Sequence, residues 1–341
     1  MAVFADEAEV YEYLGGVFRI GMADPDLVAK LQPSGVVLRI TYTNPDAVLT
    51  VDMPNSEIHT GAGQGPDPNI ELFMSADTGN RFWLGKVILP VAMAKGDVRA
   101  KGPVSKVLKL LPIAKQLFGP YKAKLEAEGR EDLLTPIAKA WSTDMGVEVA
   151  SMGIQIHGGM GFIEETGAAQ YYRDARIAPI YEGTNGIQAM DLVGRKLSQD
   201  GGASARLLIE EMKTVLTPLA ALYDGKPVER MANALSAVED ATLWLLDRKA
   251  AEDGTADVLT AADAYLKLMG DVIGGWFLAR GALAAQTLKV NGEGDADWLD
   301  GRIALYEVYA ANVLGHVSSR LAAIGQGGDL LLRMTPAVLA P

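Results

Sequence analysis

The sequence contains no cysteine among its 341 residues, and it contains only three histidines. Without cysteine the protein has no disulfide, no catalytic thiolate and no zinc–thiolate site. The histidines are His59, His157 and His316, and no two of them have the spacing that would place both on one face of a helix. Since zinc enzymes commonly take imidazole ligands from such pairs, we predict no metal site and no metal-dependent chemistry.

Long apolar runs and basic blocks are absent as well. No stretch of 18 or more apolar residues occurs, so we expect no membrane span. The first residues, MAVFADEAEVYEYL, lack the basic start and apolar run of a signal peptide, so we expect a cytoplasmic protein. The net charge of −12, with no run of Lys and Arg standing out, disfavours nucleic acid or an anionic membrane as a partner. A local basic pocket for an anionic head group remains compatible with this charge.

The composition that is present, 49% apolar and 22% charged, is typical of a globular protein. At ~150 residues per domain, the length suggests two domains. Strand-like alternation ends near Gly129–Leu134, and helical periodicity dominates from there onward. We predict a front domain over residues 1–132, a helical core segment over 133–200 and a helical extension over 201–341.

The front domain combines strand and helix signals, which indicates an α+β fold with a twisted sheet covered by helices. Alternating, β-branched segments predict strands at 36–43, 48–53, 57–60, 70–75 and 97–101. Helical patterns cover 7–22, 77–84 and 105–118, while 91–96 is expected to be a short link. We expect Asp77 to cap the second helix and Pro112 to bend the third.

The rear part predicts an all-α bundle, because helical periodicity is interrupted only by short loops rich in Gly, Asp and Pro. The expected helices are 134–157, 168–176, 184–196, 203–223, 228–252, 255–287 and 298–323.

Residues 48–132 resemble the SCP-2 (sterol carrier protein 2) family. The resemblance lies in LTVDMP (Leu49–Pro54), NIELFMSADTGNRFWLGK (Asn69–Lys86) and AKGDVRAKGPVSKVLKLLPIAK (Ala94–Lys115). It implies a sheet and helices that enclose an apolar tunnel, and a lipid or fatty acyl-CoA as ligand.

A loosely packed terminal helix would leave an apolar cavity suited to an acyl chain. The residues that would line it are apolar and come from the fourth strand and the last two helices: Phe73, Phe82, Trp83, Leu84, Val107, Leu110, Leu111 and Leu117. The alternative is that they are ordinary core residues, which is the commoner role of any single one of them.

Residues 134–197 resemble the C-terminal domain of acyl-CoA dehydrogenases. Three family motifs occur in order: QIHGGMGF (Gln155–Phe162), RDARIAPIYEGT (Arg173–Thr184) and NGIQAMDLVGRKL (Asn185–Leu197). Residues 200–340 are similar to the helical extension of the larger enzymes of this family, including those that act on methylmercaptopropionyl-CoA.

The resemblance implies roles for individual residues. Glu182 matches the catalytic base, Gly183 lets substrate approach the backbone, and Thr184 matches a flavin contact. It also implies that the ADP half of FAD from a neighbouring subunit is bound by Gln155, His157, Gly158, Gly159 and Gly161, and hence that the protein is a homo-oligomer. Read without the resemblance, the glycines are turns and the glutamate is a solvated cap.

The family's N-terminal helical domain, its middle β-domain and the first helix of its bundle have no counterpart in the chain. We therefore expect a lipid-binding or acyl-CoA-binding protein of fatty-acid metabolism with an incomplete dehydrogenase module. That module would associate with a second copy or with a full-length acyl-CoA dehydrogenase. The alternative is an FAD-dependent enzyme that oxidises acyl-CoA to 2-enoyl-CoA with Glu182 as the base. A third hypothesis is that the fusion is a gene-prediction error.

Overall fold

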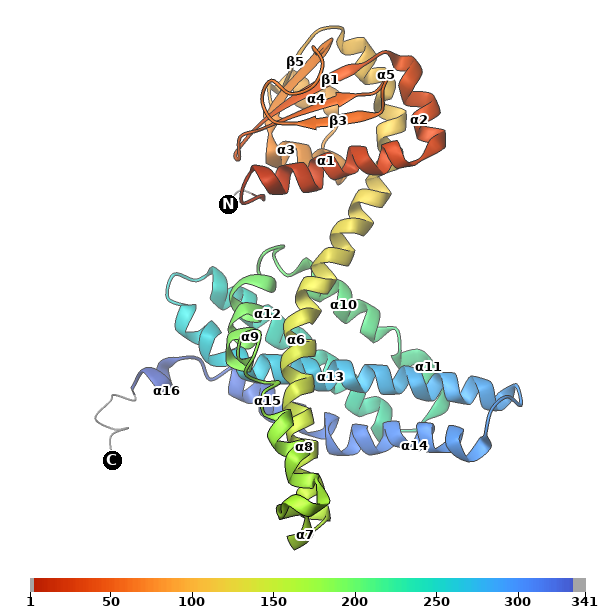
Figure 1. Cartoon of the computed structure of the whole chain (residues 1–341), viewed down its shortest axis with the longest axis vertical. Coiled ribbons are helices and arrows are strands. Elements are labelled where there is room, and N and C mark those ends of the chain that lie inside the picture. Colours follow the sequence, from red (N-terminus) through yellow and green to blue (C-terminus); the bar gives the residue numbers. More distant parts are fainter. Residues whose placement is uncertain (1–2, 334–341) are drawn as a thin grey trace. The chain divides into compact units, whose positions relative to one another are not determined.

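The computed structural model describes residues 3–333, and the chain divides between Ala127 and Glu128 into two compact units (Figure 1). The sequence predicted a boundary after residue 132 and a further division at 200, and this division of the rear part stays a prediction. Residues 1–2 of the predicted front domain and 334–341 of the predicted extension lie outside the described residues.

The front unit is built on one mixed sheet of five strands, in the order β3-β2-β1-β4-β5. The central strands β1 and β4 are parallel, and every other neighbouring pair is antiparallel. The strands are β1 (Val37–Thr43), β2 (Ala47–Asp52), β3 (Glu57–Thr60), β4 (Ile70–Ser75) and β5 (Val98–Lys101). All five predicted strands and the α+β fold class are confirmed.

The helices of the front unit cover one face of this sheet (Figure 1). They are α1 (Glu7–Ala23), α2 (Pro25–Leu31), α3 (Ala76–Trp83), α4 (Leu89–Lys95) and α5 (Val104–Ala114), with 3₁₀ turns at Gln32–Ser34 and Lys115–Leu117. Along β1, the buried Leu38, Ile40 and Tyr42 face these helices and alternate with Arg39 and Thr41 on the opposite face.

Two local predictions in the front unit are wrong. Residues 91–95 are not a link but part of helix α4, which has Pro90 in its first turn and is followed by Gly96 in the left-handed region (φ 86°). Asp77 does not cap α3, because the Oγ of Ser75 accepts the Thr78 amide at 3.1 Å and Asp77 lies in the first helical turn.

Helix α6 (Phe118–Ile156) contains residues of both units. The sequence predicted a helix only from residue 134, because the charged stretch Glu126–Leu133 suggested a boundary. Most residues of that stretch are good helix formers, and the helix continues through it and through Pro136.

The rear unit is entirely helical in its described part, as predicted. The predicted helices 203–223 and 298–323 are each broken into two, near Thr214 and Val313. The helices after α6 are α7 (Gly159–Phe162), α8 (Ala168–Ala175), α9 (Asn185–Asp191), α10 (Ala203–Lys213), α11 (Leu216–Leu222), α12 (Lys226–Ala250), α13 (Thr255–Val290), α14 (Ala296–Asn312), α15 (Val317–Ile324) and α16 (Asp329–Leu332).

Helix α13 lies at the centre of the rear core, where it receives Trp141 from α6. A Cβ at Gly270 would lie 2.2 Å from the Trp141 ring, so only glycine allows this approach. The indole Nε1 of Trp141 donates to Asp271 Oδ1 at 2.9 Å, and Arg320 Nε donates to Asp271 Oδ2 at 2.7 Å. Asp271 is 4% exposed and thereby joins α6, α13 and α15.

Candidate functional site

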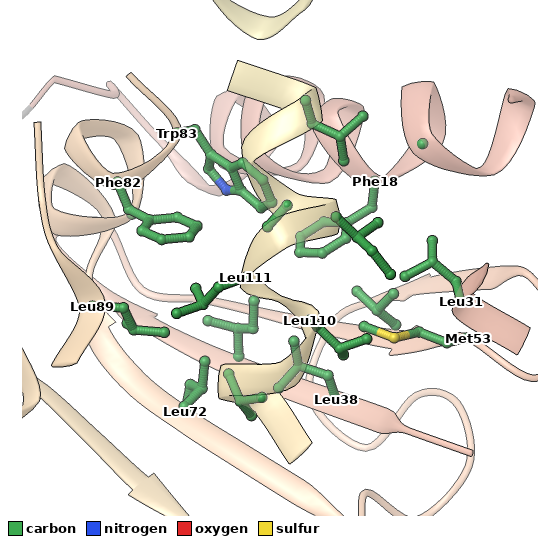
Figure 2. A pocket seen from close by; sticks show the side chains of 18 of the residues that line it. Phe18, Leu31, Leu38, Met53, Leu72, Phe82, Trp83, Leu89, Leu110 and Leu111 are labelled. Atoms are coloured by element: carbon green, nitrogen blue, oxygen red, sulfur yellow. The ribbon is translucent and has the colours of Figure 1, made fainter. Parts of the chain in front are cut away.

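The front unit contains an apolar cavity of about 90 Å³ between the sheet and its helices. Figure 2 shows side chains from α1, α2, α3, α5 and the sheet pointing into this common space. It is lined by Phe18, Gly21, Met22, Leu31, Leu38, Ile40, Tyr42, Val51, Met53, Leu72, Met74, Gly79, Phe82, Trp83, Leu89, Val107, Leu110, Leu111, Ile113, Ala114 and Leu117.

Most of the residues predicted to line a cavity do so. Phe82, Trp83, Leu110 and Leu111 lie in the lining (Figure 2). Leu117 and Val107 lie in it as well.

Phe73 and Leu84 do not line the cavity, so these two predictions are wrong. Side chains of a strand alternate between its faces, and Leu72 and Met74, the neighbours of Phe73, point into the cavity. Phe73 therefore lies on the other face of the sheet, where Lys101 Nζ is 5.0 Å from its ring centroid.

Several lining residues were missed from the sequence. Phe18 and Met22 are one helical turn apart on α1, and Leu31 and Met53 close the cavity from α2 and the end of β2. The helical spacing of the first pair was a usable signal. The contribution of Met53 depends on tertiary packing.

The polarity of the lining selects for hydrocarbon. Among the described residues 3–333, no charged side chain lines the cavity, and the polar side-chain atoms of the lining are the Tyr42 hydroxyl and the Trp83 indole nitrogen. Burial raises the pKa of Tyr42 and keeps its hydroxyl neutral. Edge-to-face contacts of Trp83 with Phe18 (5.3 Å) and Phe82 (5.0 Å) hold the aromatic end of the wall in place.

Helix α5 forms one wall and is attached by apolar contacts alone. Within residues 3–333, no hydrogen bond or ion pair joins a side chain of α5 to another element, and Pro112 removes a hydrogen bond within the helix. Its Lys106 and Lys109 are exposed, while Val107, Leu110 and Leu111 line the cavity. Apolar contacts are non-directional, so packing alone sets the position of this helix against the sheet.

The sequence on both sides of α5 is strongly basic. The net charge of the whole chain did not reveal this segment. From Arg81 to Lys124 the chain has ten Lys and Arg residues, and Asp97 is the segment's single acid. The whole chain carries −12, so the net charge conceals a strongly cationic part of the front unit.

In the rear unit, the predicted catalytic residue Glu182 lies in an exposed turn before α9. It adopts the left-handed conformation (φ 57°), which is uncommon for a residue with a side chain. The turn is held by the Gln188 side chain, which donates to the Glu182 carbonyl at 2.9 Å, and by Lys139, which donates to the Gly183 carbonyl at 2.8 Å. Thr184 makes no capping hydrogen bond to α9.

The residues predicted to bind FAD lie around the end of α6 and the short α7. Gln155, His157, Gly158 and Gly159 are exposed. Gly161 is buried, and a Cβ on it would lie 2.3 Å from the Ile154 carbonyl oxygen, so close helix packing accounts for this glycine.

A groove with charged side chains lies beside these residues. The adjacent groove carries the carboxylates of Glu164 and Glu165, which repel a pyrophosphate. Its cation, Arg173, is held by Glu164 through two bonds of 2.9 and 2.8 Å. The surrounding apolar side chains are exposed, among them Ile156 (84%), Phe162 (79%) and Tyr171 (75%). We call residues 149–190 the apolar surface segment.

Comparisons with known families match the rear part of the chain. Residues 117–197 match the acyl-CoA dehydrogenase C-terminal domain, and residues 208–335 match the family described as acetyl-CoA dehydrogenase C-terminal like. The resemblance predicted from the three motifs is thereby confirmed.

The curated relatives are dehydrogenases. The chain is 43% identical over 216 residues to 3-methylmercaptopropionyl-CoA dehydrogenase of Ruegeria pomeroyi, covering 63% of this chain and 36% of the relative. It is 29% identical over 201 residues to butyryl-CoA dehydrogenase of Syntrophomonas wolfei, covering 56% and 32%. The chain therefore spans about a third of the length of these relatives.

Solved structures of sterol carrier proteins align with part of the chain. The sterol carrier protein domain 2 of Helicoverpa armigera is 14% identical in sequence. The alignment covers 33% of this chain and 89% of that chain, with a TM-score of 0.28. Sterol carrier protein 2 from Yarrowia lipolytica is 19% identical, with 36% and 96% covered and a TM-score of 0.27. No described helix is long and apolar enough to cross a membrane.

Proposed function

We propose that the front unit binds the hydrocarbon chain of a lipid or fatty acyl-CoA in its cavity, and that the rear unit is an association module. The observation that carries the first part is the cavity itself, whose lining contains no charged side chain. Each methylene group transferred from water into such a lining contributes ~0.8 kcal/mol. The SCP-2 resemblance of residues 48–132 supports the same ligand class.

A long chain requires the cavity to enlarge. At about 90 Å³, the space is comparable to engineered cavities that hold one small aromatic ring. Helix α5 is the wall that moves, because apolar contacts alone attach it to the sheet and Pro112 weakens its hydrogen bonding. Ligand entry therefore displaces α5 outward and leaves the sheet in place.

The head group is anionic in this proposal. Lys106 and Lys109 are exposed on the helix that lines the cavity, and Lys95 is exposed on α4, whose Leu89 also lines it. A carboxylate, or the phosphates of coenzyme A, would be attracted to these ammonium groups while the chain enters the cavity.

The rear unit associates through the apolar surface segment. Exposed apolar side chains of this number are unusual for a monomer and mark a contact surface. The occupant is a second copy of this chain, and a full-length acyl-CoA dehydrogenase is the other outcome of an association test. This module links the lipid-binding unit to acyl-CoA metabolism.

The binding proposal is tested by titrating the delipidated full chain with the fluorescent fatty acid cis-parinaric acid. We expect saturable binding that Leu111→Trp weakens at least ~10-fold, because the larger ring fills the cavity. Phe73→Leu, on the other face of the same sheet, is the matched control and keeps the wild-type affinity. Absence of saturable binding, or equal affinities in the two variants, contradicts the proposal.

A second candidate function is the dehydrogenase reaction with Glu182 as base. It is favoured by the left-handed turn at Glu182, which Lys139 and Gln188 hold by hydrogen bonds to its carbonyls. FAD would supply the hydride acceptor, and a second chain would complete its site in this candidate. Flavin absorbance of the purified protein, and loss of acyl-CoA oxidation in Glu182→Gln, test it. A colourless protein that takes up no added FAD removes this candidate.

A further inference from the structure

The outer face of the front sheet, opposite the cavity, carries three metal-ligating side chains at its β2–β3 edge. Asp52 and Glu57 are directly opposite each other in the antiparallel register, and His59 is opposite Thr50. Residues two apart on a strand share a face, so all three side chains lie on the same side of the sheet. One ligand atom from each of the three lies within 4.8 Å of the others.

Two carboxylates directly opposite each other destabilise a strand pair unless a cation lies between them. Asp52 is 3% exposed, and its hydrogen bonds come from the amide and the side-chain nitrogen of Asn55, at 3.3 and 2.8 Å. Within residues 3–333, no Lys or Arg forms an ion pair with Asp52 or Glu57. A positive charge nearby stabilises a buried carboxylate.

The imidazole of His59 also lacks a partner at one nitrogen. Its Nε2 is buried without a hydrogen bond and lies 3.4 Å from Glu57 Oε2. The loop after β3 covers the ring: a Cβ at Gly65 would lie 2.6 Å from His59 Cδ2, and Gly65 has φ 80°. The ring therefore lies between the sheet and this loop, with its Nε2 near Glu57.

The guanidinium on the adjacent strand does not neutralise the cluster. Arg39 donates from Nε to Thr50 Oγ1 at 3.1 Å and from Nη2 to the Pro66 carbonyl at 3.2 Å. These bonds direct its charge toward the loop and hold that loop over the β2–β3 edge.

We propose that Asp52, Glu57 and His59 bind a divalent transition-metal cation, with Zn²⁺ preferred. One imidazole nitrogen and two carboxylate oxygens suit Zn²⁺, whereas Mg²⁺ and Ca²⁺ favour oxygen ligands alone. Water completes a tetrahedral site. The ion resolves the carboxylate repulsion, gives His59 Nε2 a partner and fastens the edge strand β3. The site lies on the opposite face of the sheet from the lipid cavity, so it is independent of the proposed ligand.

The test is isothermal titration of the EDTA-treated full chain with ZnCl₂, and absorption spectroscopy with Co²⁺. We expect one strong site per chain, the visible absorption of tetrahedral Co²⁺, and no comparable binding of Mg²⁺. His59→Gln and Glu57→Gln each raise the dissociation constant for Zn²⁺ at least ~10-fold and abolish the Co²⁺ bands.

His316→Gln, in the rear unit, is the matched control and keeps wild-type Zn²⁺ affinity. Circular dichroism shows whether each variant is folded, and Glu57 is an exposed side chain whose replacement leaves the core intact. Zn²⁺ binding that persists unchanged in both His59→Gln and Glu57→Gln overturns the proposal. Absence of a strong site in the folded wild-type chain, or equal affinity for Mg²⁺, overturns it as well.

Discussion

The two units differ in where their apolar side chains leave space or surface for a ligand or a partner. The front unit encloses a cavity of about 90 Å³ within an apolar lining. In the rear unit, Leu268, Met269 and Val272 are fully buried along α13, while many large apolar side chains of the apolar surface segment are exposed. Space inside a unit suits a small ligand, whereas apolar surface outside suits a protein partner.

The difference originates in how the helices are attached within each unit. In the rear unit, Asp271 connects three helices through Trp141 and Arg320, and small residues of α13 allow close approach. In the front unit, α5 is attached by apolar contacts alone. A wall without directional bonds leaves the cavity able to change volume, while a hydrogen-bonded core has one arrangement.

The largest expected effect compares one leucine from each unit. We expect Leu268→Ala in the rear core to lower the free energy of unfolding by ~3–4 kcal/mol, since it creates a new cavity. Leu110→Ala should cost ~1–2 kcal/mol, because one side of that leucine already faces empty space. Urea unfolding followed by tryptophan fluorescence measures both, with Trp83 the only tryptophan before residue 141. Equal losses of unfolding free energy in the two variants would contradict this difference between the units.

The second prediction concerns the hydrogen bonds that Asp271 accepts in the rear core. Asp271→Ala leaves Trp141 Nε1 without its acceptor and Arg320 without its carboxylate, and should destabilise the rear unit by ~3 kcal/mol. Asp263→Ala, on the exposed face of the same helix, should change stability by less than ~0.5 kcal/mol. Calorimetry of both variants checks this, and the front unit's transition should be unchanged.

The third prediction addresses the external apolar surface. Ile156→Asp and Phe162→Asp place charge in the proposed interface and should raise the dissociation constant of the assembly at least ~10-fold. Val290→Asp, 75% exposed at the end of α13, is the control and should leave association unchanged. Light scattering over a concentration series measures the mass. A monomeric wild-type chain, with no added partner, excludes self-association.

The smallest expected effect depends on pH. Burial alone would raise the pKa of Asp132, but hydrogen bonds from Lys196 and Gln199 lower it below the ordinary value of 3.8. A carboxylate with a lowered pKa stabilises the folded state above the unfolded pKa and loses that effect as pH falls through the folded pKa. Asp132→Asn should therefore cost less than ~1 kcal/mol at pH 7, and its difference from wild type should shrink below pH 4 in thermal unfolding. A difference independent of pH would contradict this assignment.

The periodicity of apolar residues predicted the helices and strands better than it predicted which side chains are in contact. The alternation of Val37–Thr43 specified a strand with one buried face, and the structure has that strand with that face. The same rule, applied residue by residue, would have placed Phe73 on the face opposite Leu72. The helix α4 was missed because its seven residues are too short to show periodicity, although Pro90 and Gly96 mark its two ends.

The amino-acid sequence by itself determined the α+β front unit, the helical rear unit and the dehydrogenase motifs, since these depend on residue period and on motif order. Only the tertiary structure decided which side chains share a space. It brought Phe18, Met53 and Leu111 to one cavity, and Asp52, Glu57 and His59 to one edge of the sheet. The physical reason is that strand pairing and helix packing join residues far apart in the chain, and no local pattern encodes those distances.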